Sequence, residues 1–162
     1  MRAKRPSRNV PGWPSTSASD RAPHEQPDDE VGGFPSSYEL TGSPGLVEGC
    51  AAGDLLEIDA DGLFQVVRRG PNLCIQAYGR PPFDAESLES LNSAFVPLGG
   101  LVEAPTDRRF IVVTVPAAAG FPAVEAVMER WAASVSVLVE WGFSNVFGPD
   151  AEPLNWWLES GV

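Results

Sequence analysis

The chain has 162 residues, 43% of them hydrophobic, which suffices for one soluble domain with a buried core. Its formal net charge is −11, and from Ser36 onward 17 acidic residues face 6 arginines. So acidic a body repels phosphates and anionic membranes, which excludes nucleic acid and membrane surfaces as expected partners and favours a basic protein. Two cysteines are too few for a disulfide framework, and the first residues lack the apolar run of a secretion signal. We therefore expect a cytoplasmic protein with reduced cysteines, and the alternative is a single bridge between Cys50 and Cys74.

Composition divides the chain into three parts. Residues 1–35 are rich in Pro, Ser, Arg and Asp and hold few aliphatic side chains, so they bury too little apolar surface to offset the entropy of ordering. They are predicted to be a disordered tail. Residues 36–148 are predicted to form a single α+β domain, and residues 149–162 a C-terminal tail that contains Trp156 and Trp157.

The domain begins with strand patterns. Residues 54–58 and 63–69 flank an acidic turn that ends in Asp61 and Gly62, a strong hairpin signal. A second turn at 70–72 leads into the apolar segment 73–79. These three segments predict a three-stranded meander.

Two helices alternate with the remaining strands. Residues 81–100 carry apolar side chains at helical spacing behind the capping residue Asp84, and residues 121–135 form an apolar face behind Pro122. Strands are predicted at 101–105, 109–115 and 136–142.

The order from Leu73 onward is therefore strand, helix, strand, strand, helix, strand. This is the order of a ferredoxin-like split βαβ core, in which both helices cover one face of a four-stranded antiparallel sheet. The N-terminal β-hairpin is an extension of this core, and it either widens the sheet or forms a small β subdomain.

These segments resemble a known family. Residues 52–79 place a Gly-Asp pair at the entry of a strand, then an acidic hairpin, a turn and an apolar strand, and the pattern continues in 98–100, 110–116 and 140–142. Over about Tyr38 to Val146 the chain resembles the bacterial family of domains of unknown function DUF4265, whose members are small uncharacterised proteins. The resemblance implies a fold and no established activity.

Several catalytic chemistries lack an essential residue. His24 is the only histidine and lies in the predicted tail, so triads with a histidine base and zinc sites with histidine ligands are not expected. Lys4 is the only lysine, which excludes a P-loop or Schiff-base lysine in the folded part. We expect no catalytic residue, metal or cofactor, and a non-enzymatic role.

The acidic run contains Asp54, Glu57, Asp59 and Asp61. It resembles the start of a calcium loop, but the twelfth position, where an EF-hand has a glutamate, is Arg68. The run is better interpreted as a turn with solvated edge charges. If it has a function, it acts as an exposed acidic surface, and charge reversal at Asp59 and Asp61 is expected to alter binding and leave the fold intact.

The cysteines and the two adjacent tryptophans leave alternatives open. Cys74 alternates with apolar residues and is predicted in the core, whereas Cys50 in a loop is either inert or a reactive thiol. Trp156 and Trp157 cannot both point inward from one regular element, so they either dock on the domain's own sheet or contact a partner.

The sequence favours a protein-binding, immunity-like module that recognises a basic protein. The candidate binding residues are Asp54, Glu57, Asp59, Asp61, Trp156 and Trp157. The alternative function is a small-molecule-sensing domain, by analogy with other ferredoxin-like proteins. A histidine-free hydrolase that uses Asp54 or Glu57 is a third hypothesis.

Overall fold

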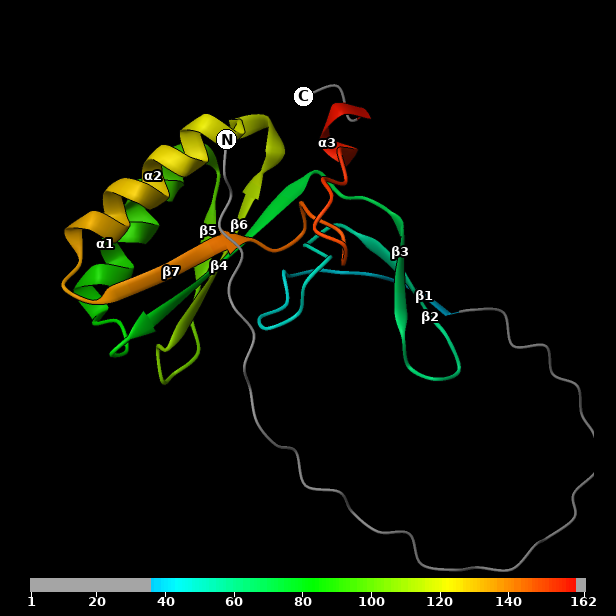
Figure 1. The fold of residues 1–162 in the computed structure, drawn as a ribbon, viewed down its shortest axis with the longest axis horizontal. Coiled ribbons are helices and arrows are strands. Elements are labelled where there is room, and N and C mark those ends of the chain that lie inside the picture. The colour runs from blue at the N-terminus through cyan, green and yellow to red at the C-terminus, as the bar shows by residue number, and fades with distance from the viewer. Residues whose placement is uncertain (1–35, 160–162) are drawn as a thin grey trace, which may run out of the picture.

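The computed structural model describes residues 36–159. The expected tail of residues 1–35, with His24, and residues 160–162 lie outside the described residues. The described chain forms two antiparallel sheets, one of three strands and one of four, and Figure 1 shows the small sheet beside the large one. The mixed α+β content predicted from the sequence is confirmed.

The small sheet contains the predicted hairpin. Its strands are β1 (Ser36–Glu39), β2 (Leu55–Ile58) and β3 (Phe64–Arg68), in the order β1-β2-β3. The hairpin β2–β3 is confirmed. The predicted meander is wrong, because the third strand of this sheet is β1 and the strand after β3 joins the other sheet.

The chain leaves the small sheet at Gly70 and Pro71. A Cβ atom on Gly70 would lie 2.4 Å from the carbonyl carbon of Gly53, so the two backbones meet where only glycine fits. Pro71 has no N–H to donate to a neighbouring strand, and its carbonyl accepts a hydrogen bond from the N–H of Ala117 at 2.8 Å. The strand after this turn therefore pairs with a different part of the chain.

The large sheet has the long strand β4 at its centre. Its strands are β4 (Asn72–Arg80), β5 (Leu101–Glu103), β6 (Phe110–Pro116) and β7 (Leu138–Phe143), in the order β5-β6-β4-β7. All three pairings are antiparallel. The edge strand β5 is only three residues long, which limits its use as a template for another strand.

Each long helix connects two strands of the large sheet. Helix α1 (Ala85–Phe95) begins at the predicted cap, since the N–H of Ser87 donates to Asp84 Oδ1 at 2.6 Å, and a short 3-10 turn, η1 (Val96–Leu98), follows it. A second such turn, η2 (Ala117–Ala119), precedes α2 (Phe121–Ser134), which has Pro122 in its first turn.

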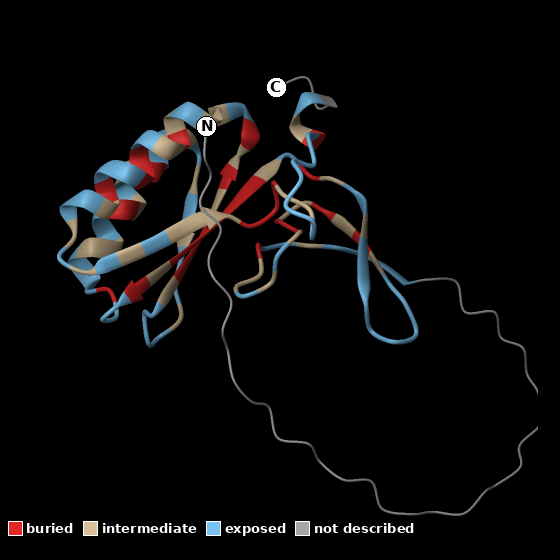
Figure 2. Cartoon of the chain, in the orientation of Figure 1, coloured by how far each residue is buried: buried red, intermediate tan, exposed pale blue. Residues whose placement is uncertain are grey.

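Both helices cover one face of the large sheet (Figure 1). The main core joins Leu73, Ile75 and Ala77 of β4 to side chains of both helices, such as Phe95 and Trp131. Because side chains alternate across a strand, these three residues share the face that the helices cover. Figure 2 shows the buried residues concentrated between helices and sheet and around the junction of the two sheets.

The opposite face of the large sheet is partly covered by the segment between β1 and β2. Ala51 packs against Cys74 and Val112, and the N–H of Ala52 donates to Ser43 Oγ, which also accepts from Thr114 Oγ1 at 2.6 Å. This segment, residues 40–54, links the small sheet to the large one.

The C-terminal part folds back onto the core. Phe147 forms an isolated antiparallel bridge with Pro153, and the short helix α3 (Trp156–Glu159) follows. Among the described residues no helix is long and apolar enough to cross a membrane.

Candidate functional site

The small sheet carries apolar side chains on one face. Cross-strand pairing places Tyr38 opposite Leu56 and Leu56 opposite Val66, while Ile58 stands opposite Phe64. Directly opposed residues, and residues two positions apart in a strand, share a face. We call this set the apolar face: Tyr38, Leu56, Ile58, Phe64 and Val66.

Much of the apolar face is in contact with solvent. Tyr38 is 52% exposed and Ile58 and Phe64 are each 39% exposed, whereas Leu56, nearer the large sheet, is buried. In Figure 2 the exposed residues extend along the hairpin away from the junction. The other face of the same sheet carries Glu39, Glu57, Gln65 and Arg68 beside Leu55, so it is the more polar of the two, and the apolar face is partly open to solvent.

The acidic hairpin tip borders the apolar face. Asp59 Oδ1 accepts hydrogen bonds from the N–H groups of Asp61 (3.0 Å) and Leu63 (2.8 Å), so this carboxylate shapes the turn. Asp61 is exposed and its carboxylate is not used by the turn, while Glu57 is half-buried on the opposite face. The structure thus brings Asp59 and Asp61 together beside the apolar face and separates Glu57 from it.

Asp54 is fully buried. Its Oδ1 accepts from the N–H of Gly70 at 2.6 Å, and its Oδ2 accepts from the N–H of Ala51 at 3.0 Å and from Arg69 Nη1 at 3.2 Å. Arg69 Nη1 also donates to the carbonyl of Gly49. Asp54 therefore ties segment 40–54 to the end of β3, and it is not part of any exposed acidic surface.

Trp156 and Trp157 pack on the domain. The indole N–H of Trp156 donates to the carbonyl of Asn145 at 2.9 Å, and its side chain is buried in the main core. Trp157 is half-buried, with its ring 5.1 Å from that of Phe121 in an edge-on arrangement. Both tryptophans therefore dock on the protein itself, which is one of the two alternatives that the sequence left open.

Both cysteines are free and buried. Burial, followed by the negative charge of Asp54, raises the pKa of the Cys50 thiol to about 11, and burial also raises the pKa of Cys74. A thiol with so high a pKa carries almost no thiolate at neutral pH, so Cys50 lacks the activation that a nucleophile needs. The expectation that Cys74 lies in the core is confirmed.

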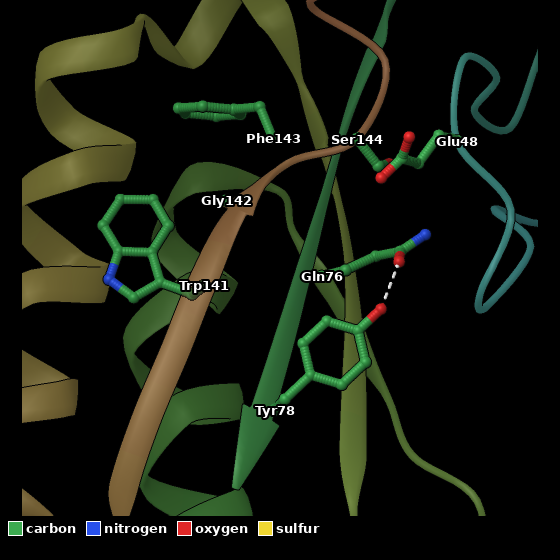
Figure 3. A pocket seen from close by; sticks show the side chains of 7 residues that line it. All are labelled: Glu48, Gln76, Tyr78, Trp141, Gly142, Phe143 and Ser144. Carbon is green, nitrogen blue, oxygen red and sulfur yellow. Dashed lines mark hydrogen bonds between the residues drawn. The ribbon is translucent and has the colours of Figure 1, made fainter. Parts of the chain in front are cut away.

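A small hollow lies beside the edge strand β7 and the neighbouring strand β4 of the large sheet. It has a volume of about 30 Å³ and is lined by Glu48, Gln76, Tyr78, Trp141, Gly142, Phe143 and Ser144. Figure 3 shows the side chains of Glu48, Gln76 and Tyr78 on one side of the strands, while Trp141 extends toward the helices. None of these seven residues is among the candidate site residues predicted from the sequence.

Within residues 36–159, no group of three or more His, Cys, Asp and Glu side chains could hold a metal ion. The apolar face has a signal in the sequence, because Leu56, Ile58, Phe64 and Val66 alternate with other residues within the predicted hairpin. Tyr38 and the hollow could not, since they depend on which distant strands pair.

The fold and these sites define a small α+β protein with two antiparallel sheets, the smaller of which carries a partly exposed apolar face. A family model described as a domain of unknown function, DUF4265, matches residues 35–137. The chain belongs to this family, which confirms the resemblance seen in the sequence. No protein of curated function matches the chain significantly.

One solved structure is similar in fold. It is the crystal structure of a hypothetical protein from Neisseria gonorrhoeae, with a TM-score of 0.52 and 12% sequence identity, covering 67% of this chain and 74% of that chain. At this identity the likeness concerns the fold alone.

Proposed function

We propose that the protein is a non-enzymatic binding module that holds a basic, partly apolar segment of another protein against the apolar face of its small sheet. The observation that carries the proposal is the exposure of Tyr38, Ile58 and Phe64 on one face. Contiguous apolar side chains are seldom left in water on a protein that acts alone, and such surfaces mark interaction sites.

The charge around the apolar face defines the chemistry of the partner. Asp61 is exposed at the hairpin tip, and the chain as a whole carries a formal charge of −11. Acidic surroundings attract a basic segment and speed its encounter, while apolar contacts supply the affinity. An immunity-like role, in which an acidic protein neutralises a basic effector, is consistent with this chemistry.

The proposed scaffold is a ferredoxin-like core with the small sheet as an added subdomain. The strand order β5-β6-β4-β7 and the shared face of α1 and α2 support this assignment. In this arrangement the large sheet and its helices provide stability, and the small sheet is the part that is free to bind.

The alternative role as a small-molecule sensor has weaker support. Sites for metabolites usually enclose roughly 300–1,000 Å³. The hollow beside Tyr78 has about 30 Å³, which is too small for such a ligand. A sensing role would need another site, so the binding module remains the preferred function.

A displayed library of random peptides tests the proposal. Peptides selected on the whole chain should combine Arg or Lys with apolar residues, and Phe64→Ser should weaken their binding at least about tenfold. Gln65→Ser is the matched control, because Gln65 is the next residue on the same strand and lies on the other face. Both variants are first checked for folding by circular dichroism.

The charge part of the proposal is tested with Asp61→Lys. Asp61 suits this test better than Asp59, whose carboxylate holds the turn. The selected peptides should bind Asp61→Lys more weakly, and added salt should reduce this difference. Selected peptides without basic residues, or equal binding to wild type and Phe64→Ser, would contradict the proposal.

A further inference from the structure

Four of the seven residues that line the hollow beside Tyr78 carry hydrogen-bond acceptors, and the others are Trp141, Gly142 and Phe143. Glu48 contributes a carboxylate, Gln76 an amide oxygen, and Tyr78 and Ser144 hydroxyl oxygens. Among the described residues that line the hollow there is no Lys or Arg, and the charged side chain is that of Glu48. A ligand group that suits these atoms is therefore a cationic hydrogen-bond donor.

Hydrogen bonds fix the orientation of the polar groups in the hollow. Gln76 Nε2 donates to the carbonyl of Val47 at 2.8 Å, so its Oε1 must point the other way and accepts from the hydroxyl of Tyr78 at 2.8 Å (Figure 3). Because the Tyr78 hydroxyl donates its hydrogen bond to Gln76, the lone pairs of the Tyr78 oxygen can accept a hydrogen bond from a ligand. Gln76 is 6% exposed, and its amide is held by these hydrogen bonds before any ligand arrives.

The surroundings of Tyr78 keep its phenol neutral. Burial, and then the negative charge of Glu48, raise the pKa of Tyr78 above its ordinary value. The same negative charge attracts a cation.

The size of the hollow selects among cations. A volume of about 30 Å³ accepts a group on the order of one or two water molecules. A primary ammonium group is compact, whereas a guanidinium group is a wider planar fork. Opposite Gln76 in the sheet stands Gly142, which has no side chain to fill this space.

We propose that the hollow formed by Glu48, Gln76, Tyr78 and Ser144 binds a single primary ammonium group. The group belongs either to a lysine side chain of a peptide or to a free alkylamine, which present the same chemistry. This site lies on the large sheet, so it is separate from the apolar face and does not depend on the proposed function.

Titration of the isotope-labelled chain with n-butylammonium, followed by nuclear magnetic resonance, tests the site. The signals of Tyr78 and Ser144 should shift in a saturable way, whereas n-butanol and tetramethylammonium should leave them unchanged because one lacks the charge and the other exceeds the space. The absence of saturable shifts with n-butylammonium, or equal shifts with n-butanol, would overturn the proposal.

Two variants and a control locate the binding. Glu48→Gln should weaken binding of n-butylammonium about tenfold, and Gly142→Val should abolish it by filling the hollow. Glu89→Gln, which removes one exposed charge from α1 on the other side of the sheet, should have no effect. Equal binding by wild type and both hollow variants would overturn the proposal even if the signals shift.

The source of the ammonium group is decided by comparing two ligands. A short lysine peptide with blocked ends that binds more tightly than cadaverine indicates a protein ligand, and the reverse order indicates a free amine. The peptides selected from the library should lose binding to Phe64→Ser, whereas n-butylammonium should still bind this variant. That result would show that the apolar face and the hollow are separate sites.

Discussion

Asp54 and Arg69 form a salt bridge of 3.2 Å in which the aspartate side chain is 1% exposed and the arginine side chain 23%. The pair joins segment 40–54 to the end of β3, and the same carboxylate also accepts from the backbone of Gly70 and Ala51. Asp54, which the sequence offers as a candidate binding residue, is thus buried at the junction between the two sheets.

The first prediction concerns the buried carboxylate of Asp54. Asp54→Asn replaces one acceptor oxygen with a donor and removes the charge that faces Arg69. Loss of one partner of a buried pair leaves unpaired polar groups, so unfolding free energy should fall by about 3 kcal/mol. Urea denaturation measures this, with Asp61→Asn as an exposed control expected to change stability by less than about 0.5 kcal/mol. Equal stabilities of the two variants would refute the structural role.

The close approach of Gly70 to Gly53 gives the second prediction. A Cβ on Gly70 would meet the backbone of Gly53 at 2.4 to 2.8 Å, whereas a Cβ on Gly42 would meet nothing within 4 Å. Gly70→Ala should therefore destabilise the protein by about 2 kcal/mol or more, because backbone atoms cannot retreat as a flexible side chain does. Gly42→Ala should be nearly neutral. Thermal unfolding compares the two, and similar melting temperatures would contradict the tight junction.

The third prediction assigns the C-terminal helix to the folded domain. Trp156 is buried in the main core and Leu158 is 68% exposed. Trp156→Ala should cost about 3–5 kcal/mol of unfolding free energy, while Leu158→Ala should cost little. Guanidinium denaturation of both variants tests this. A small effect of Trp156→Ala would mean that the segment is an appended tail.

The fourth prediction concerns alkaline pH and Cys50. Its pKa is about 11 in the folded protein and 9.0 for an ordinary thiol. Above pH 9 the unfolded chain loses this proton while the folded chain keeps it, so the unfolded state binds fewer protons and stability falls as pH rises from 9 to 11. Below pH 9 the contribution is fully present.

Unfolding free energy measured across this pH range in wild type and Cys50→Ala tests the fourth prediction. The variant should lose stability more gradually, though not hold it constant, because the pKa of Cys74 is raised as well. Parallel declines in the two proteins would show that Cys50 does not titrate as described. Alkylation by iodoacetamide at neutral pH should be slow in the folded protein and fast in denaturant.

Local patterns in the sequence determined most of the elements. The spacing of apolar residues and the caps at Asp84 and Pro122 depend on neighbours within one or two turns, so the helices α1 and α2 were predicted close to their observed bounds. The hairpin β2–β3 followed from the acidic turn between two strand patterns for the same reason. Each of these signals acts over a few residues and needs no knowledge of the rest of the chain.

The tertiary structure decided which distant segments meet. The pairing of β1 with β2, the burial of Asp54, and the assembly of Glu48 with Gln76 and Tyr78 all depend on contacts between residues far apart in the chain. The sequence shows how many carboxylates the acidic run contains. It does not show which of them are exposed, because an aspartate is the same residue whether its side chain is in water or buried between two sheets. Long-range packing, not residue type, moved Asp54 inside and left Tyr38 and Phe64 at the surface.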